Sequence, residues 1–497
     1  MRLTALLPLV LELAGSLVNA LPAQQDQHVL GLDSLQQPPD ELATGDDYSC
    51  WEDDGKTGTG RLSQWSRSNK EEFIAALRKN QAKEWIVVMG NEAGDLDSLV
   101  SAMALSFMYN HLDPPQKAVA LLQTEQDALD LRPENSLSLH YAKMSGGHRD
   151  LLTIDELPIK PEELGHRIQG IALVDHNVPR REWNGAQIAA IIDHHADQGV
   201  ANGTANPRII EVSGSCSSLV TRYILDHLPG ADKAYPKPGH KLFEHDADSL
   251  LSNSTSDAEL FAKGPLPTEL VELLLRTIAI DSDALSKDSR QPVDKESAQR
   301  LFPHSSWKHR KLKEVMKVLD KDLTASRKAL DDLDLRSLLR RDWKGDSIRT
   351  KSKKYPHIAL GFASAPVSLE EQIERTPEKT VPEWFAIERA WTAEIQADVS
   401  VALTNFHHPK TGEKTRQLAV VVAHGYGKRL HEGSANRLFK AIKNAVEKAG
   451  VKELKDWKRP DGKKLLPRRA VYEYQSDIAS RKFWRPIIEK SVREWEG

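Results

Sequence analysis

The sequence predicts an α/β protein whose first domain contains a parallel sheet and whose second domain is smaller. Three short apolar runs, at residues 85–89, 171–174 and 188–192, support the parallel sheet. Short runs of this kind, several of them rich in Val and Ile, are typical of strands buried on both faces of a sheet. The spacing of apolar residues predicts helices at 69–82 and 99–111, which gives the alternating order of an α/β fold.

The second half of the chain shows its own strand and helix patterns. Apolar runs at 358–363, 399–405 and 418–422 predict strands, and the spacing over 435–448 predicts a helix. Residues 305–345 are charged and helical in pattern, so the connection between the domains should lie there. We therefore expect a signal peptide at 1–20, a disordered leader at 21–68, a first domain at 69–304, a helical connector at 305–335 and a second domain at 336–497.

The N-terminus has the pattern of a secretory signal peptide. Arg2 precedes a mostly apolar stretch at 3–18, and residues 18–20 form a small-residue cleavage pattern. The stretch is too short and too interrupted to be a comfortable membrane span, although an uncleaved apolar leader or an anchor stays open as the alternative. Glycosylation sequons at Asn202 and Asn253 agree with a secretory route. We therefore expect a secreted or vacuolar protein.

Each apolar run of the first domain ends in a group of polar residues. Residues 90–98 read Gly-Asn-Glu-Ala-Gly-Asp-Leu-Asp-Ser and include Asp95 and Asp97. Asp175 follows the second run, and residues 193–195 read Asp-His-His. The loops that follow parallel strands converge on one crevice of an open sheet, so these side chains should meet. Carboxylates and imidazoles are ligands for divalent metal ions, and the sequence therefore predicts a metal centre.

Together with three later segments, these groups resemble the motifs of the DHH phosphoesterase superfamily, which is named for the triplet at 193–195. Residues 275–282, Leu-Arg-Thr-Ile-Ala-Ile-Asp-Ser, resemble the family's fourth motif, an apolar strand that ends in Asp-Ser/Thr. Residues 338–344 resemble the basic signature of a DHHA2 domain, and residues 479–482 resemble its terminal SRK motif. The resemblance implies a parallel-sheet DHH domain, a smaller α/β DHHA2 domain, and an active site in the cleft between them.

The resemblance also implies a site for two or more divalent ions, Mg²⁺ or Mn²⁺. Six residues of this chain match the family's ligand positions: Asn91, Asp95, Asp97, Asp175, His194 and Asp281. Asp175 is the implied bridge, with Asn91 and Asp95 on one ion and the other three residues on the second. Asp283 stays open as a rival to Asp281, which is preferred because it follows the apolar run directly. Ion pairs of this kind, about 3.5–4 Å apart, activate water and offset phosphoryl charge.

The second histidine of the triplet has a different implied role. His195 matches a family residue that faces the phosphate, so we expect it to act in catalysis together with the bridging Asp175. Asp193 and His176 are candidates for holding the metal ligands in their orientation.

Charge is unevenly distributed along the chain, whose net charge is -4. Residues 301–497 carry 41 Lys and Arg against 27 Asp and Glu, whereas residues 1–300 carry a net charge of -18. A basic half favours a polyanion as ligand, although two ordinary solvated surfaces would show the same counts. In the family the second domain closes over the first and contributes phosphate-binding groups, which here match Arg340, Arg341, Lys344, Arg416, Arg481 and Lys482.

Two positions favour one activity within the family. Exopolyphosphatases and prune-type proteins carry Asn at the position of Asn91, where family II pyrophosphatases carry His. The intact His195 argues against animal prune-type variants. We therefore expect an exopolyphosphatase that releases terminal orthophosphate from polyphosphate. An inorganic pyrophosphatase, a nucleotide phosphodiesterase of the same fold, and a non-catalytic secreted phosphate-binding protein are the alternatives.

The sequence predicts no macromolecular partner for the protein. The Gly-Gly-Gly-His signature of nuclease-type relatives is not visible, so no nucleic acid is expected as a partner, and no membrane partner is expected either. The oligomeric state is open. So is the pairing of the two cysteines, Cys50 and Cys216.

Overall fold

A computed structural model describes residues 55–497, apart from 232–265, 409, 424–429, 455–466 and 475–479. Several predictions fall outside the described residues: the signal peptide, most of the leader, Asn253 and Cys50. Cys216 is buried in the first turn of a helix. Among the described residues, no helix combines the length and the apolar character that crossing a membrane requires.

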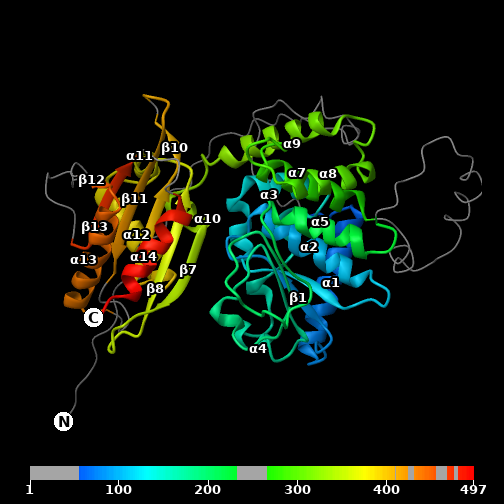
Figure 1. Cartoon of the computed structure of the whole chain (residues 1–497), viewed down its shortest axis with the longest axis horizontal. Coiled ribbons are helices and arrows are strands. Elements are labelled where there is room, and N and C mark those ends of the chain that lie inside the picture. Colours follow the sequence, from blue (N-terminus) through cyan, green and yellow to red (C-terminus); the bar gives the residue numbers. More distant parts are fainter. Residues whose placement is uncertain (1–54, 232–265, 409, 424–429, 455–466, 475–479) are drawn as a thin grey trace, which may run out of the picture. The chain divides into compact units, whose positions relative to one another are not determined.

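The first domain contains a six-stranded sheet in which every neighbouring pair is parallel (Figure 1). Its strands lie in the order β3-β2-β1-β4-β5-β6. Their bounds are β1 (Ile86–Met89), β2 (Ala118–Leu122), β3 (Leu152–Thr153), β4 (Gly170–Val174), β5 (Ile188–Asp193) and β6 (Arg208–Ile210). The chain leaves β1 toward β2 on one side and returns at β4 on the other, so the strand order reverses between β1 and β4. Open α/β sheets bind ligands at this point, at the carboxyl ends of the strands.

Both faces of this sheet are covered by apolar side chains. Val88 and Ala172 face a core shared with α2 (Leu96–Asn110), whereas Val87 and Leu173 face a second core on the opposite side. The first core also includes residues of α5 (Cys216–His227), α7 (Thr268–Asp281), α8 (Pro292–Leu301) and α9 (Leu312–Lys328). The second core includes residues of α1 (Arg61–Arg78) and α4 (Pro161–Leu164). Burial on both faces explains why the strands are almost purely apolar.

Shorter elements complete the first domain. They are η3 (Gln126–Leu131), α3 (Pro133–Tyr141), η4 (Gly146–His148), η5 (Ile154–Glu156), η6 (Arg181–Trp183) and η7 (Phe302–His304). The helix α9 lies within the predicted connector and packs against α7 and α3, so it forms part of the first domain's body.

The second domain contains a mixed sheet in the order β12-β13-β11-β9-β8-β7, and β10 pairs with β11. The strands are β7 (Trp343–Arg349), β8 (His357–Ala365), β9 (Val399–Thr404), β10 (Phe406–His407), β11 (Lys414–Val422), β12 (Lys452–Glu453) and β13 (Arg469–Tyr474). The pair β8–β9 is parallel and the other pairs are antiparallel. The predicted strands at 358–363, 399–405 and 418–422 correspond to β8, β9 and β11, whose ends differ from the predicted ends by four residues at most.

Helices cover both faces of this second sheet. One core contains residues of α13 (Glu432–Lys448) and α14 (Arg481–Arg493), and the other contains residues of α10 (Leu335–Arg341) and α12 (Val381–Glu394). A further short helix, α11 (Leu369–Glu374), packs against α12. The prediction of an α/β fold with a second, separate sheet is therefore confirmed.

Three local predictions are wrong. The apolar run at 275–281, expected as a strand, is the end of the helix α7. A continuously apolar segment does not reveal its period, and here the hydroxyl of Thr277 donates to the carbonyl of Leu273, four residues back, as in a helix. The expected disordered leader ends earlier than residue 68, because α1 begins at Arg61. The helical pattern expected up to residue 345 ends with α10 at Arg341, and β7 follows.

Candidate metal centre

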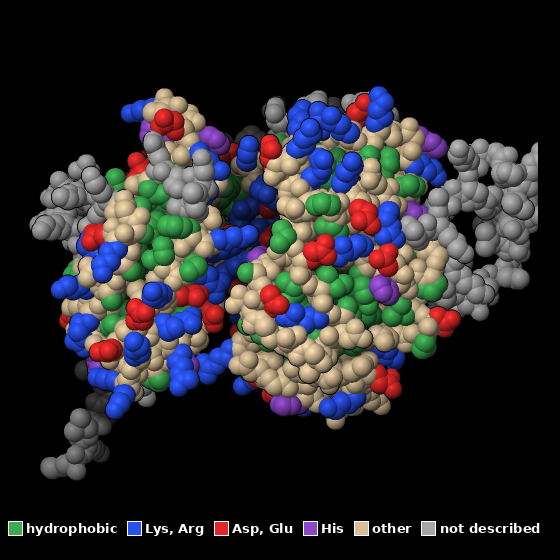
Figure 2. Space-filling model, in the orientation of Figure 1, with side chains coloured by type: hydrophobic (Ala, Val, Ile, Leu, Met, Phe, Trp, Pro, Cys, Tyr) green, Lys and Arg blue, Asp and Glu red, His purple; other side chains and the backbone are tan. Residues whose placement is uncertain are grey.

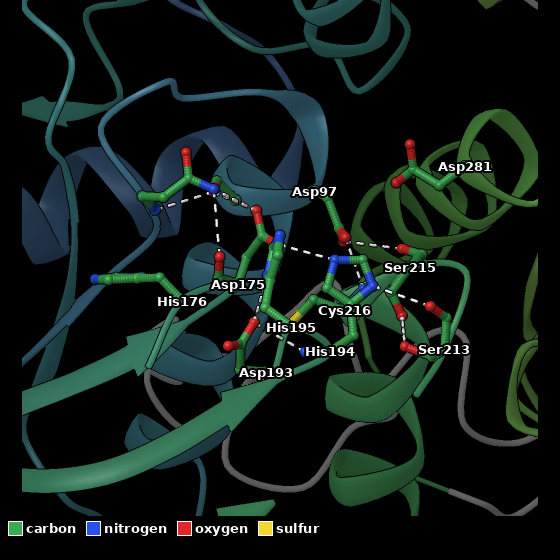
Figure 3. A network of polar contacts seen from close by, with 12 residues as sticks. Asp97, Asp175, His176, Asp193, His194, His195, Ser213, Ser215, Cys216 and Asp281 are labelled. Carbon is green, nitrogen blue, oxygen red and sulfur yellow. Dashed lines mark hydrogen bonds and ion pairs between the residues drawn. The ribbon is translucent and has the colours of Figure 1, made fainter. Parts of the chain in front are cut away.

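Asp175 lies at the centre of the group of polar residues at the strand ends. It follows β4 directly, is 3% exposed, and has a left-handed backbone with a φ of 59°. Few residues other than Gly adopt this conformation, although Asp and Asn tolerate it better than most. The unusual backbone turns the carboxylate of Asp175 toward the loops that follow β1 and β5 (Figure 3).

The two oxygens of Asp175 have different neighbours. Oδ2 accepts hydrogen bonds from the amide nitrogen Nδ2 of Asn91 at 2.7 Å and from the hydroxyl of Ser98 at 2.6 Å. Oδ1 lies 3.2 Å from Nε2 of His194 and 3.8 Å from Nδ1 of His195. One oxygen is thus fixed by neutral donors, while the other faces the two imidazoles. We call Asp175, His194 and His195 the Asp175 cluster.

The ring of His194 is oriented by a backbone contact. Its Nδ1 lies 3.1 Å from the carbonyl oxygen of Ser213. A carbonyl can only accept, so Nδ1 carries the hydrogen and Nε2 is directed to the centre of the site. Burial would lower the pKa of His194, but the contact with Asp175 and the charge of Asp97 raise it to about 10. The carboxylates around Nε2 of His194 thus favour positive charge at a position where a cation could bind.

His195 is held by Asp193, the last residue of β5. Its Nδ1 donates to Oδ1 of Asp193 at 2.8 Å, and the other oxygen of Asp193 accepts from Asn177 at 2.5 Å. Asp193 is fully buried, whereas the side chain of His195 is 36% exposed. The contact leaves Nε2 of His195 as the ring atom that can meet a ligand. His176 points away from both imidazoles and contacts the carbonyl of Val174 at 2.9 Å (Figure 3).

The residues after β1 begin α2, and two of them carry carboxylates. Asp95 caps the helix by accepting from the backbone N–H of Ser98 at 3.1 Å. Burial would raise the pKa of Asp95, but the nearby charges of Arg132 and Lys344 lower it to about 2. Asp95 is therefore a permanent negative charge at the edge of the site.

Asp97 lies in the first turn of α2 and reaches the N-terminus of α5. Its carboxylate accepts from the backbone N–H groups of Cys216 at 2.6 Å and Ser217 at 2.7 Å. The first N–H groups of a helix have no partner within the helix, and Asp97 satisfies two of them. The hydroxyl of Ser215 also donates to Oδ1 at 2.8 Å. Oδ1 therefore accepts from several donors, whereas Oδ2 accepts from the N–H of Cys216 and keeps a lone pair for a further ligand.

The loop before α5 is fixed by Asp294, a fully buried residue of α8. Its Oδ2 accepts from the backbone N–H of Gly214 at 2.9 Å, and its Oδ1 lies 3.4 Å from the N–H of Ser215. A side chain at Gly214 would place a Cβ 2.8 Å from Oδ2 of Asp294, so a larger residue there would have to displace this carboxylate. Ser213, whose carbonyl orients His194, is therefore part of a segment that Asp294 holds in place.

Asp281 ends α7, a helix that belongs to the same core as α2 and α5. Its Oδ2 is buried without a hydrogen-bond partner among the described residues, and its Oδ1 lies 3.8 Å from Nη2 of Arg327. Burial, together with the charge of Asp97, raises the pKa of Asp281 well above its usual value. The rival Asp283 is exposed and accepts a hydrogen bond from Ser289, outside the site.

The residues present fit a site for divalent cations. Asp175, His194 and His195 each offer a ligand atom, and these atoms lie within 4.8 Å of one another. Burial and the charge of Asp95 raise the pKa of Asp175 to about 6, as expected where carboxylates gather in a buried site that a cation would stabilise. The buried, unpartnered Oδ2 of Asp281 is a further sign of a missing cation.

Asn91 contacts Asp175 through its amide nitrogen. Its Nδ2 donates to Asp175, and its Oδ1 accepts from the backbone N–H of Ala93 at 3.0 Å. Asn91 thus supports the carboxylate of Asp175, and its role as a metal ligand stays a prediction.

Three of the predicted phosphate-binding residues are bound to carboxylates or carbonyls of the chain itself. Arg340 forms two hydrogen bonds to Asp127, at 2.7 and 2.9 Å. Arg341 binds both oxygens of Glu134, at 2.8 and 3.0 Å, and Arg481 donates to the carbonyl of Asp342 at 3.1 Å. The structure uses the first two arginines to join α10 to the first domain.

The other three predicted phosphate-binding residues, Lys344, Arg416 and Lys482, lie on the second domain. Lys344 is in β7, and its charge contributes to the lowered pKa of Asp95. Arg416 is in β11 opposite Tyr474, and Lys482 is exposed in the first turn of α14. Lys and Arg side chains are numerous on the surface of this domain (Figure 2). Of the six, Lys344 is the one whose electrostatic effect on Asp95 links it to the site.

Sequence reasoning missed three residues that shape the site: Ser98, Ser213 and Asp294. Ser98 stands inside the first motif, and its place directly after Asp97 was the available signal. Ser213 and Asp294 act through contacts with residues 19 and 80 positions away, so only the fold reveals them.

Two family profiles match the chain. Residues 85–253 match the "DHH family, N-terminal domain", and residues 321–491 match the "DHHA2 domain". The chain therefore belongs to the DHH family and carries a DHHA2 domain.

Individual relatives share parts of the chain. A Schizosaccharomyces pombe protein named "Putative exopolyphosphatase" is 33% identical over 173 residues, which is 33% of this chain and 44% of that protein. Mouse "Exopolyphosphatase PRUNE1" is 30% identical over 29% of this chain and 31% of its own length. An Archaeoglobus fulgidus protein named "Probable manganese-dependent inorganic pyrophosphatase" is 25% identical over 39% of this chain and 57% of that protein. The chain thus spans less than two thirds of each of these relatives.

Proposed function

We propose that this protein is a metal-dependent phosphoanhydride hydrolase, and that it acts as an exopolyphosphatase on linear polyphosphate. One observation carries the proposal: the strand ends of the first sheet bring Asp175, His194 and His195 into one cluster, with Asp97 and Asp281 beside it. Divalent ions bound there would supply positive charge and activate a water molecule for attack on phosphorus.

The chain's own residues prepare the site for this reaction. Asn91 and Ser98 fix one oxygen of Asp175, which leaves the other oxygen directed at the imidazoles. Asp193 fixes His195, so that its Nε2 can donate a hydrogen bond to a phosphoryl oxygen. A donor that is already oriented costs no reorganisation when charge develops on the phosphate during attack.

Polyphosphate is favoured over pyrophosphate as substrate on two grounds. The position of Asn91 carries an amide, as the exopolyphosphatases of the family do. The S. pombe and mouse relatives bear exopolyphosphatase names, whereas the pyrophosphatase relative is less identical. A phosphodiesterase activity and a binding function without catalysis remain the competing proposals, and the fully formed Asp175 cluster speaks against the second.

The metal is proposed to be Mg²⁺ or Mn²⁺. A site rich in carboxylates suits both Mg²⁺ and Mn²⁺. The manganese-dependent name of the A. fulgidus relative supports Mn²⁺ as one of the ions to be tested.

A panel of substrates tests the proposal. Orthophosphate release should be measured from pyrophosphate, tripolyphosphate, long-chain polyphosphate and a cyclic nucleotide, each with Mg²⁺ and with Mn²⁺. We expect the highest kcat/KM on tripolyphosphate or longer chains and little turnover of the cyclic nucleotide. Faster hydrolysis of pyrophosphate than of any longer chain would make the protein a pyrophosphatase, and no release from any substrate would leave a binding function.

A further inference from the structure

Two arginines lie beside the loops and carboxylates of the candidate metal centre. Arg132 precedes α3, and Arg327 lies in the last turn of α9, which packs on helices of the first domain. Neither residue belongs to the basic signatures of the second domain. Arg132 contacts the carbonyl of Ala93 in the loop after β1, and Arg327 lies 3.8 Å from a carboxylate oxygen of Asp281.

Arg132 is buried with one end of its guanidinium unused. Its side chain is 8% exposed, and its Nε donates to the carbonyl of Ala93 at 2.8 Å. Its Nη2 is buried and has no hydrogen-bond partner among the described residues, since Asp342 Oδ1 is 3.7 Å away. A buried donor left without an acceptor is costly, so a ligand that supplies an acceptor would be bound favourably.

Arg327 has charged neighbours but no close hydrogen bond to them. Its Nε lies 3.6 Å from Oε1 of Glu134, and its Nη2 lies 3.8 Å from Oδ1 of Asp281. These separations are longer than a hydrogen bond. The side chain is 38% exposed, so the guanidinium can be reached from solvent.

Glu134 does not neutralise both arginines. It is 1% exposed, and Arg341 already binds both of its oxygens at 2.8 and 3.0 Å. Arg132 lies 3.6 Å from the same carboxylate, as Arg327 does. One carboxylate thus serves three guanidinium groups, and two of these retain donors and charge for another anion.

We propose that Arg132 and Arg327 form a phosphate-binding pair, which holds a phosphoryl group of the substrate beside Asp281 and the loop after β1. Guanidinium groups suit this ligand because their planar N–H donors match phosphate oxygens two at a time. The choice of a phosphoanhydride as the ligand rests on the proposed function. The pair adds to the six phosphate-binding residues that the sequence predicts, which are Arg340, Arg341, Lys344, Arg416, Arg481 and Lys482.

Replacement of Arg327 tests the pair, because this side chain is partly exposed at a helix end and its loss should not disturb the core. The matched control is Lys328→Gln, which removes the same charge from the next, exposed residue of α9. Binding of methylenediphosphonate, a diphosphonate that cannot be hydrolysed, is measured by calorimetry on the Mg²⁺-loaded protein. Binding of Mn²⁺ to metal-stripped protein and the melting temperature are measured alongside.

Replacement of Arg327 should affect diphosphonate binding and Mn²⁺ binding differently. Arg327→Gln should weaken diphosphonate binding about 10- to 100-fold, as expected for the loss of charge-assisted hydrogen bonds. Mn²⁺ binding should stay the same or become tighter, because a cation 3.8 Å from Asp281 has been removed. Arg327→Lys should restore part of the affinity, since it keeps the charge but not the planar donors. Lys328→Gln should bind both ligands as the wild type does.

Other outcomes would overturn the proposal. Equal diphosphonate affinity in Arg327→Gln and Lys328→Gln would mean that Arg327 contributes only long-range charge. A parallel loss of diphosphonate binding, Mn²⁺ binding and melting temperature would mean a structural role.

Arg132→Lys provides an independent test of the second arginine. It should weaken diphosphonate binding with little change in melting temperature, and unchanged binding would remove Arg132 from the pair. All of these affinities can be measured even if the wild type hydrolyses no polyphosphate. Failure of the proposed function and failure of the phosphate-binding pair are therefore distinguishable.

Discussion

The carboxylate of Asp175 is held by neutral donors on one oxygen and faces imidazoles with the other. This division has a chemical consequence. An oxygen fixed by Asn91 and Ser98 cannot rotate away, so the second oxygen keeps its direction when a cation or a substrate arrives. The orphaned oxygen of Asp281 lies at the opposite end of the same network, where burial makes its negative charge costly until a cation compensates it.

Asp281→Asn should separate the two candidates of the fourth motif. Because burial raises the pKa of Asp281, its charged form destabilises the metal-free fold at neutral pH. The neutral amide should therefore raise the melting temperature of metal-stripped protein by about 2–4 °C. It should also reduce the added stability that Mn²⁺ confers and lower kcat about a hundredfold or more.

Asp283→Asn is the matched control for this change. Asp283 is exposed and bound to Ser289, so its replacement should alter neither the Mn²⁺-dependent rise in melting temperature nor kcat by more than about twofold. Thermal unfolding with and without Mn²⁺ measures both variants. If Asp283→Asn loses activity and Asp281→Asn keeps it, the ligand has been assigned to the wrong carboxylate.

The gathering of polar residues at the strand ends could be predicted, because each motif is contiguous in sequence and directly follows an apolar run. Asp175, His194 and His195 were expected together, and the structure brings them together. The contact that turns Asn91 toward Asp175 could not be predicted, because it depends on which end of an amide faces a neighbour. Arg340 and Arg341 were assigned to phosphate because their charge is visible in the sequence, but their partners Asp127 and Glu134 are not.

At the level of elements, the site depends on two helix N-termini and one loop. The helix α2 begins at the end of β1, and its residue Asp97 caps α5 across the core. The loop before α5 carries Ser213, which orients His194. Asp294 of α8 holds this loop, so three helices and one strand end cooperate in the placement of a single imidazole.

Asp294→Asn should weaken metal binding without any direct contact to a metal ligand. The amide keeps the size of the side chain but gives up one of the two acceptor oxygens that receive Gly214 and Ser215. Loss of such a supporting contact reduces metal affinity by about 10- to 100-fold in other sites. Mn²⁺ titration of metal-stripped protein measures the effect.

Glu296→Gln on the same helix is the control, since Glu296 is exposed and pairs with Arg300 of α8 at 3.7 Å. It should leave Mn²⁺ affinity unchanged. An Asp294→Asn variant that binds Mn²⁺ as tightly as the wild type would show that the loop keeps its shape without this carboxylate.

Three strands of each sheet could be predicted from the sequence, whereas α7 could not. Strands such as β1 and β4 are short apolar runs bounded by polar residues, which fixes their type. The helix α7 is buried along most of its length, so its apolar residues show no face. The helix begins at Thr268, seven residues before the motif at 275–282 on which the strand prediction was based.

At the scale of the whole molecule, α10 joins the two domains through paired charges. Arg341 is buried and binds Glu134, and Arg340 binds Asp127. A buried ion pair contributes little net stability, but removal of one partner leaves an uncompensated charge. These arginines therefore define how α10 meets the first domain, and their role in phosphate binding stays a prediction.

The N-terminal segment gives a prediction for the whole protein. We propose that residues 1–20 are removed in a secretory pathway, on the grounds of the apolar stretch and the cleavage pattern. The mature protein should begin near Leu21 and carry a glycan at Asn202, whose side chain is exposed, or at Asn253. Mass spectrometry of the secreted protein tests this. An intact N-terminus from Met1, with both asparagines unmodified, would contradict the secretory route.

Orthophosphate release from tripolyphosphate, followed while Mn²⁺ is added to metal-stripped protein, tests the central claim most directly. The wild type should show no release without metal and a saturable rise with Mn²⁺. Asp175→Asn should remain inactive at every concentration, because a neutral amide cannot compensate the charge of two cations. Equal rates with and without metal, or an Asp175→Asn variant as active as the wild type, would contradict the assignment of this cluster as the catalytic metal centre.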